Sequence, residues 1–134
     1  LESYRLPFYT GEVTYLFSPE TYAHLDLSGA GHVYLSPTAF TGALVKVAAE
    51  GEDGEQLLLW DPYEADVTDA VRAKQTIAVT VVGTRHNVFG PLHLVPAIQG
   101  AYGPGSFLTS GSEWSNDYVL TDSALCGVTF SVRK

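Results

Sequence analysis

Short stretches in which apolar and polar residues alternate recur along most of the chain. Successive side chains of a β-strand point to opposite faces of a sheet, so this period of two predicts strands with one buried face and one wet face. The three clearest examples are Ala23–Ser28, Thr76–Val81 and Val128–Arg133. In the last of these, the polar phase includes Thr129, Ser131 and Arg133, which is typical of an open antiparallel sheet.

The alternation also predicts which side chains are buried. The residues expected to face the core in the first two stretches are Ala23, Leu25, Leu27, Ile77, Val79 and Val81. Further strands are expected at Glu12–Phe17, Gly42–Ala48, Leu57–Trp60 and Asn87–Leu94.

A turn signal separates two of these strands. Glycine and the Asp-Gly pair in Glu50–Gly54 readily adopt the positive φ angles that hairpins require. A hairpin is therefore expected to join Leu44–Val47 to Leu57–Trp60.

Helix is expected at one place, Asp66–Ala73, where Asp66 or Thr68 can cap free backbone N–H groups. About seven or eight short strands with almost no helix describe an all-β fold, a two-sheet antiparallel β-sandwich of jelly-roll type. The chain has 134 residues, which is a usual size for one domain. We therefore expect a single β-sandwich domain over residues 1–134.

The segment Gly100–Asn116 breaks the alternation and is rich in glycine, serine and threonine. A loop of this length inside a compact domain is usually functional or disordered. Because it contains Phe107, Leu108 and Trp114, we expect it to pack on something.

Composition and charge exclude several classes of protein. The net charge is −8 with seven Lys and Arg, which argues against nucleic-acid binding because phosphate affinity is built from basic residues. No apolar run approaches the roughly eighteen residues that span a bilayer, so no membrane partner is expected. The lone Cys126 cannot form an internal disulfide, and we interpret it as a small core residue.

Three segments taken together resemble a known family. They are Leu6–Gly11, Trp60–Thr68 and Val82–His93, followed by the closing pair Trp114 and Tyr118. Their order resembles the sugar-binding-type jelly-roll domain, with a galactose-binding-domain-like fold, that is appended to large bacterial glycoside hydrolases such as family-two and rhamnosidase-type enzymes. In the resembling domains the hairpin often carries Asn-Gly, whereas this chain has Glu50-Gly51.

The resemblance implies an accessory module rather than an enzyme. Its expected partners are an oligo- or polysaccharide and a catalytic domain of the same polypeptide, and no cofactor is required. The chain begins without an initiator Met or a signal peptide, so we expect a domain excised from a larger enzyme. Localisation is then inherited from the parent, and an extracellular or cell-surface place is favoured if that enzyme is exported. The alternative is a purely structural domain that buttresses a neighbouring catalytic domain.

Arg85, His86 and Asn87 form the expected hydrogen-bonding part of a sugar site, because they combine a cation, an imidazole and an amide at a sheet end. The rings expected to stack on a sugar are Trp60, Tyr102 and Trp114, with Tyr63 also available. An alternative stays open, in which Arg85 and Asn87 tie loop backbones down and Phe89 fills the core.

The acidic residues allow two other uses. Glycoside hydrolysis needs two facing carboxyl groups, for which Asp61, Glu64, Asp66 and Asp69 are candidates, although capping and turn formation explain them more simply. A structural calcium ion is one option, since hard cations take carboxylate and carbonyl oxygens. The acidic residues at Glu50–Glu55 are alternatively explained as a solvated hairpin tip that binds no ion. His86 and His93 lack an obvious third ligand for zinc, and His24 and His32 are expected at the surface.

Overall fold

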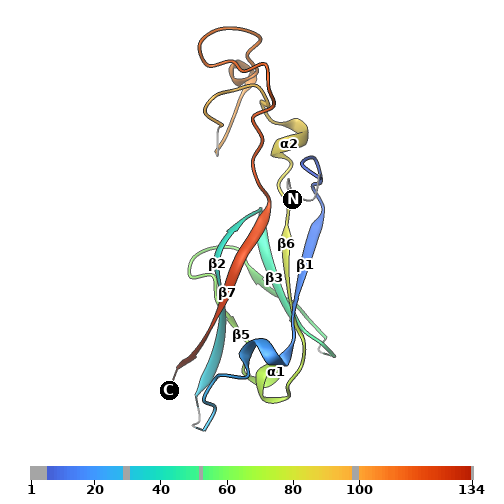
Figure 1. Cartoon of the computed structure of the whole chain (residues 1–134), viewed down its shortest axis with the longest axis vertical. Helices are drawn as coiled ribbons and strands as arrows, with labels where there is room; N and C mark the ends of the chain where they lie inside the picture. Colours follow the sequence, from blue (N-terminus) through green and yellow to red (C-terminus); the bar gives the residue numbers. More distant parts are fainter. Residues whose placement is uncertain (1–5, 29–30, 52, 98–99, 134) are drawn as a thin grey trace. The chain divides into compact units, whose positions relative to one another are not determined.

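The computed structural model describes residues 6–28, 31–51, 53–97 and 100–133, and its contacts group the chain into two compact units (Figure 1). The sandwich unit comprises residues 12–83 and 124–134, and the loop unit comprises residues 1–11 and 84–123. Each unit is described by itself below. The expectation of a single domain over 1–134 stays a prediction.

All seven strands found among the described residues lie in the sandwich unit. They are β1 (Glu12–Phe17), β2 (His32–Thr41), β3 (Leu44–Ala49), β4 (Gln56–Leu58), β5 (Ala65–Asp66), β6 (Ile77–Val82) and β7 (Ala124–Arg133). Every neighbouring pair is antiparallel, and the strands form two sheets in the orders β1-β6-β3-β4 and β5-β2-β7. The predicted all-β architecture with two antiparallel sheets is therefore confirmed.

The core of the sandwich unit is aliphatic. Ile77, Val79 and Val81 of β6 are no more than 2% exposed, as their alternation predicted. They belong to one buried cluster with Val33 and Leu35 of β2, which comes from the other sheet. Full burial of such a side chain stabilises the fold by about 1.5–3 kcal/mol, so this shared cluster is the main reason that the two sheets stay together.

Several sequence predictions in this unit are confirmed. β1 has the predicted bounds, and β3 and β4 form the predicted hairpin. Gly51 and Gly54 in its turn have φ values of +83° and +142°, which glycine adopts without strain. Glu52 lies outside the described residues.

The predicted helix is also present, as α1 (Thr68–Arg72). The carboxylate of Asp66 accepts hydrogen bonds from the backbone N–H of Thr68, at 3.0 Å, and from its hydroxyl group. Asp66 therefore satisfies a free donor at the start of the helix, as the sequence suggested.

The predicted strand at Ala23–Ser28 is wrong. A 3-10 helix, η2 (Pro19–Tyr22), precedes this segment, and the segment itself pairs with no described strand. Ala23 is exposed, Leu27 is 37% exposed, and Asp26 accepts a hydrogen bond from the N–H of Ser28. That local turn uses a backbone N–H group that a sheet would have paired, so the alternating residues here form no hydrogen-bonded strand.

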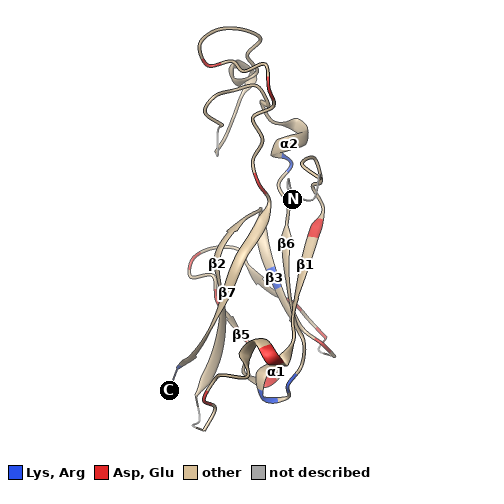
Figure 2. Ribbon diagram, in the orientation of Figure 1, with Lys and Arg blue, Asp and Glu red and all other residues tan. Residues whose placement is uncertain are grey.

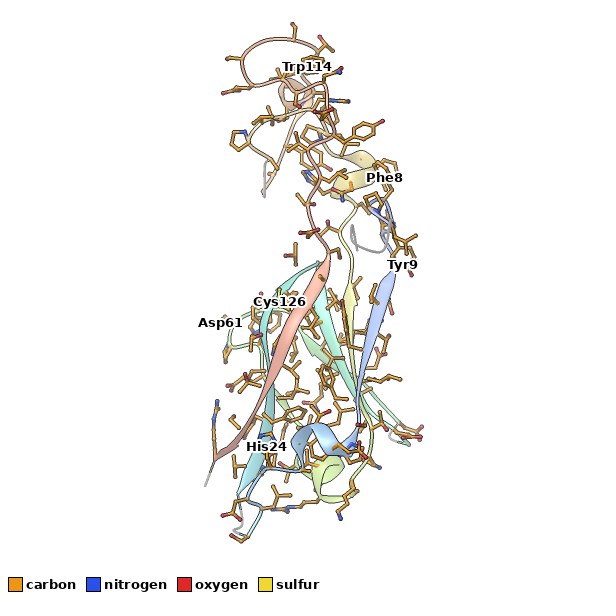
Figure 3. The ribbon with its side chains drawn as sticks, viewed as in Figure 1. Phe8, Tyr9, His24, Asp61, Trp114 and Cys126 are labelled. Carbon is orange, nitrogen blue, oxygen red and sulfur yellow. The ribbon has the colours of Figure 1, made fainter. Side chains whose placement is uncertain are left out.

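The predicted strand at Asn87–Leu94 is also wrong, because the segment begins with the short helix α2 (His86–Phe89) in the loop unit. Phe89 does not fill the core, since it is 64% exposed. Cys126 on β7 is exposed rather than buried (Figure 3). It follows Leu125 in a strand whose inward phase is interrupted by register shifts against β2, so period counting misplaces it.

The loop unit is built from turns. Its residues 92–95 and 113–119 run alongside each other, and three backbone hydrogen bonds of 2.6–2.8 Å join Leu92 to Val119, His93 to Ser115 and Val95 to Glu113. The predicted long loop at residues 100–116 contains one 3-10 turn, η3 (Pro104–Ser106), and no described strand. No helix in the described part of the chain is long and apolar enough to cross a membrane.

Candidate functional site

The six residues expected at a sugar site fall in both units. Arg85, His86, Asn87, Tyr102 and Trp114 belong to the loop unit, whereas Trp60 lies in the sandwich unit between β4 and β5. The two groups are therefore considered separately.

Asn87 has its hydrogen-bonding capacity filled within the protein. Its side-chain NH₂ donates to the carbonyl oxygens of Pro7 (2.7 Å) and Thr121 (2.8 Å). Its Oδ1 accepts from the backbone N–H (2.9 Å) and the hydroxyl (3.1 Å) of Thr121. An amide offers two donors and an oxygen with two lone pairs, so Asn87 acts as a clamp that holds three distant segments of the loop unit together.

His86 lies in a ring cluster. Its imidazole meets the ring of Tyr102 edge to face at 5.8 Å, and Tyr102 meets Phe107 in the same way at 5.9 Å. A Cβ at Gly90 would lie 2.5 Å from the backbone oxygen of His86, which explains the glycine after α2. The Nε2 atom of His86 is buried and has no hydrogen-bond partner among the described residues.

Trp114 belongs to a second ring cluster. It is half-buried and stacks on His93 at 6.0 Å with an interplanar angle of 26°. His93 donates from Nδ1 to the carbonyl oxygen of Ser115 at 2.9 Å, and its ring also contacts Tyr118, which meets Phe8 edge to face. One face of Trp114 is therefore already occupied by a protein ring.

Arg85 is exposed at the start of α2, and its carbonyl oxygen accepts the N–H groups of Val88 and Phe89 at 3.1 and 3.0 Å. Its guanidinium makes no ion pair with another described residue. Arg85 thus has a backbone role and a side chain that is open to a ligand.

The sandwich unit contains a hollow of about 430 Å³ beside β2, which we call the β2 hollow. Its walls are residues 36–40 of β2 and residues 61–64 of the loop before β5. The hollow exists because β5 pairs with β2 only at Tyr34 and Leu35, so β2 has no strand partner on that side from Ser36 onward. Figure 3 labels Asp61 in the loop that forms the other wall.

At Pro37, the free edge of β2 has a backbone acceptor and no backbone donor. Val33 bonds through its backbone to Val67 and Thr68, on the side of β5, so alternate residues of β2 direct their backbone groups to this side. Pro37 has the same phase and lacks an N–H, and it therefore presents a carbonyl oxygen alone.

The side chains around the β2 hollow mix hydroxyls, carboxylates and rings. Tyr63 and Phe40 meet edge to face at 5.0 Å. Hydroxyl groups come from Ser36 and Thr38, and carboxylates come from Asp61 and Glu64, so that polar groups and ring surface share one small space.

Glu64 is fixed by Arg133. The two side chains form a bidentate ion pair, in which Arg133 Nη1 donates to Glu64 Oε2 at 2.8 Å. The guanidinium also lies over the Tyr34 ring, 4.8 Å from its centroid. Hydrogen bonds from Arg133, its positive charge and a hydrogen bond from Ser36 hold the pKa of Glu64 below its ordinary value.

Trp60 directly precedes this wall and is 73% exposed, the largest exposed fraction among the large hydrophobic side chains described. The run Trp60-Asp61-Pro62-Tyr63-Glu64 was visible in the sequence, and it places ring and carboxylate together. Ser36, Thr38 and Phe40 were missed, because no motif marks them and Pro37 obscures the strand that carries them.

A second hollow of about 430 Å³ lies next to Asp66 of β5 and is lined by α1, the β3–β4 hairpin and His32. Asp66 bonds to Thr68 and to Nδ1 of His32 (2.9 Å), while the side-chain amide of Gln56 bonds both backbone groups of Asp66. The hydrogen bond from Thr68 is the main cause that lowers the pKa of Asp66. His24 and His32 are exposed, as expected, and His32 begins β2.

Among the described residues, no three His, Cys, Asp or Glu side chains come close enough to hold a metal ion, and a structural calcium stays a prediction. Comparison with protein-family models, with curated proteins and with solved structures found no match to this chain.

Proposed function

We propose that this chain is a non-catalytic carbohydrate-binding module of a glycoside hydrolase, with a jelly-roll, galactose-binding-domain-like sandwich, and that it binds an oligo- or polysaccharide at the β2 hollow. The observation that carries the proposal is Trp60, which is 73% exposed and directly precedes in sequence Asp61, the first wall residue of a hollow with hydroxyl, carboxylate and ring surface. A large indole exposed to this extent loses the stabilisation that burial would give, and contact with a ligand restores it.

The chemistry of a sugar matches this surface. A pyranose ring has an apolar C–H face that stacks on an aromatic ring and an edge of hydroxyl groups that donate and accept hydrogen bonds. Trp60 and Tyr63 supply ring surface with little loss of side-chain entropy. Asp61, Ser36 and the carbonyl oxygen of Pro37 supply acceptors for sugar hydroxyls.

In the loop unit, we propose that Arg85 and Tyr102 provide further sugar contacts, since Arg85 is exposed and Tyr102 is 38% exposed. His86 and Trp114 present less surface because their rings already contact Tyr102 and His93. Asn87 serves these loop-unit contacts indirectly, because it holds the segment that begins at Arg85.

Glu64 supports a binding role over glycoside hydrolysis. A general acid for that reaction needs a pKa raised toward neutral, so that the carboxyl group keeps its proton. The pKa of Glu64 is instead lowered by the hydrogen bonds and charge of Arg133, which favours the ionised form. Glu64 therefore does not suit the role of the protonated general acid.

The proposal is tested by affinity electrophoresis of the chain in gels that contain plant or bacterial polysaccharides, followed by calorimetry. Trp60→Ala is expected to weaken binding about tenfold, which is the effect of losing about 1.4 kcal/mol of contact between the sugar and the indole ring. The matched control is Leu16→Ala, which removes an apolar side chain that is 71% exposed on β1 of the other sheet. Absence of retardation by every glycan contradicts the proposal.

A second candidate is a structural module that docks onto the catalytic domain of the same polypeptide. Nine of the fourteen large hydrophobic side chains that are exposed among the described residues belong to the loop unit. Figure 2 shows few charged residues there, and the described ones are Arg85, Glu113, Asp117 and Asp122. Aromatic enrichment with charge depletion is typical of the core of a protein interface.

This second candidate has a separate test. Phe107→Ser is expected to lower the stability of the isolated chain by only about 0.5–1.5 kcal/mol, because Phe107 is 51% exposed and loses its edge-to-face contact with Tyr102. In the full-length polypeptide the same change is expected to expose the domain to proteolysis. Equal resistance of the full-length protein with and without Phe107→Ser contradicts docking through this surface.

A further inference from the structure

The charges around the β2 hollow are not balanced. Glu64 is neutralised by Arg133, which forms a bidentate pair with it and lies over the ring of Tyr34. Asp61 is exposed on the same wall, at residues 61–64, and forms no ion pair with another described residue. The hollow therefore carries one carboxylate without an ion-pair partner among the described residues, and the cation bound to its other carboxylate already makes two contacts there.

An uncompensated carboxylate acts differently on neutral and acidic glycans. It accepts hydrogen bonds from one or two sugar hydroxyl groups, and such charge-assisted bonds are about twice as strong as neutral ones. A uronate or sulfate brought to about 4 Å from the same carboxylate is repelled, and at a protein surface this repulsion is large enough to weaken binding by tenfold or more. Arg133 cannot offset it without releasing Glu64.

We propose that the β2 hollow takes neutral, hydroxyl-rich glycans and rejects uronate-containing or sulfated ones, with Asp61 as the residue that determines this specificity. The inference rests on the proposed function and narrows its substrate class. The backbone agrees with it, since Pro37 lacks an N–H and therefore provides no backbone donor for an anion at the hollow.

The test compares each neutral polysaccharide that binds the wild-type chain with the same polymer after oxidation of its primary alcohols to carboxylates. This pair shares one backbone and differs in charge. The wild-type chain is expected to bind the neutral form at least about tenfold more tightly at low salt, and the difference is expected to shrink in high salt because exposed charges are screened.

Asp61→Asn is expected to remove most of this difference by raising affinity for the oxidised polymer, since the amide keeps an acceptor oxygen and loses the charge. The matched control is Asp53→Asn, which removes the same charge from an exposed residue at the other hollow of the sandwich unit. It is expected to leave the difference unchanged.

The outcomes separate the two proposals. Equal wild-type affinity for both polymers, or equal effects of Asp61→Asn and Asp53→Asn, overturns the specificity inference while glycan binding at Trp60 stands. Glycan binding that Trp60→Ala does not weaken overturns the proposed location, and the inference about Asp61 with it. Lack of binding to any polymer overturns both.

Discussion

The two units of this chain are stabilised by different physical means. In the sandwich unit, Val33, Leu35, Val45, Ile77 and Val79 have no exposed surface, and regular ladders pair their backbones. In the loop unit, Leu94 is the one buried hydrophobic residue among those described, and the amide of Asn87 makes four hydrogen bonds. Burial of apolar area therefore stabilises the sandwich unit, whereas a few specific polar and ring contacts stabilise the loop unit.

This difference predicts how far damage spreads. A close-packed apolar core is shared by all of its strands, so a cavity in it lowers the stability of the whole sandwich. A polar clamp serves the segments that it joins, so its loss opens those segments first. Three substitutions, each with a control, test this difference between the two units.

The largest effect is expected for Leu35→Ala, because Leu35 on β2 has no exposed surface and belongs to the cluster shared by both sheets. Removal of its side chain is expected to lower the free energy of unfolding by about 2–5 kcal/mol. Urea denaturation followed by circular dichroism measures this. Leu57→Ala on β4, which is 53% exposed, is the control and is expected to change it by about 0.5 kcal/mol or less. Similar losses for both variants contradict the account of the core.

A smaller and local effect is expected for Asn87→Ala. Loss of the clamp leaves the carbonyl oxygens of Pro7 and Thr121 without their partner, and each buried polar group left unsatisfied costs about 1–3 kcal/mol. Amide hydrogen exchange is expected to accelerate at Thr121 while protection in β6 is unchanged. Asn116→Ala, at an exposed asparagine of the same unit, is the control. Equal loss of protection in β6 contradicts the separation of the two units.

The smallest effect is expected from acidification of the sandwich unit. The folded-state pKa of Glu64 lies below its ordinary value of 4.5, so the unfolded chain binds more protons in this range. The stabilisation by Arg133 is complete above pH 4.5 and is lost as the pH falls through the folded-state pKa. Glu64→Gln is expected to flatten the dependence of the melting temperature on pH below 4.5, whereas Glu50→Gln serves as a surface control. An unchanged slope contradicts the role of the ion pair.

Much of the sandwich could be predicted from sequence, because its strands obey a local rule. β1, β6 and β7 alternate apolar and polar residues, and Ile77, Val79 and Val81 point inward as that period requires. β2 was missed because Pro37 lies within it, and proline usually argues against a central strand. The shortness of β5 explains why proline is tolerated, because β5 pairs only with Tyr34 and Leu35 and leaves β2 as an edge strand at Pro37.

The loop unit could not be predicted in the same way, since its contacts join residues far apart in sequence. Asn87 binds Pro7 and Thr121, which are 80 and 34 residues away, and nothing near Asn87 in the chain marks these partners. A polar triplet at Arg85–Asn87 therefore predicts a ligand site and a clamp equally well. The sequence proposed Trp60 as a stacking ring, and that role stays a prediction, whereas the β2 wall of the neighbouring hollow depended on a strand that the sequence did not predict.

The two-residue length of β5 affects how the sequence of this protein can evolve. The β2 hollow occupies the place where a longer third strand would lie, so its outer wall is a loop rather than part of the hydrogen-bonded sheet. Residues 59–62 contribute no side chain to the core cluster or to the hydrophobic side chains packed against it, so we expect insertions there to disturb the core little. Mutation can therefore change this wall of the hollow at little cost to folding, and a library confined to residues 59–62 is the natural way to vary the proposed glycan contacts.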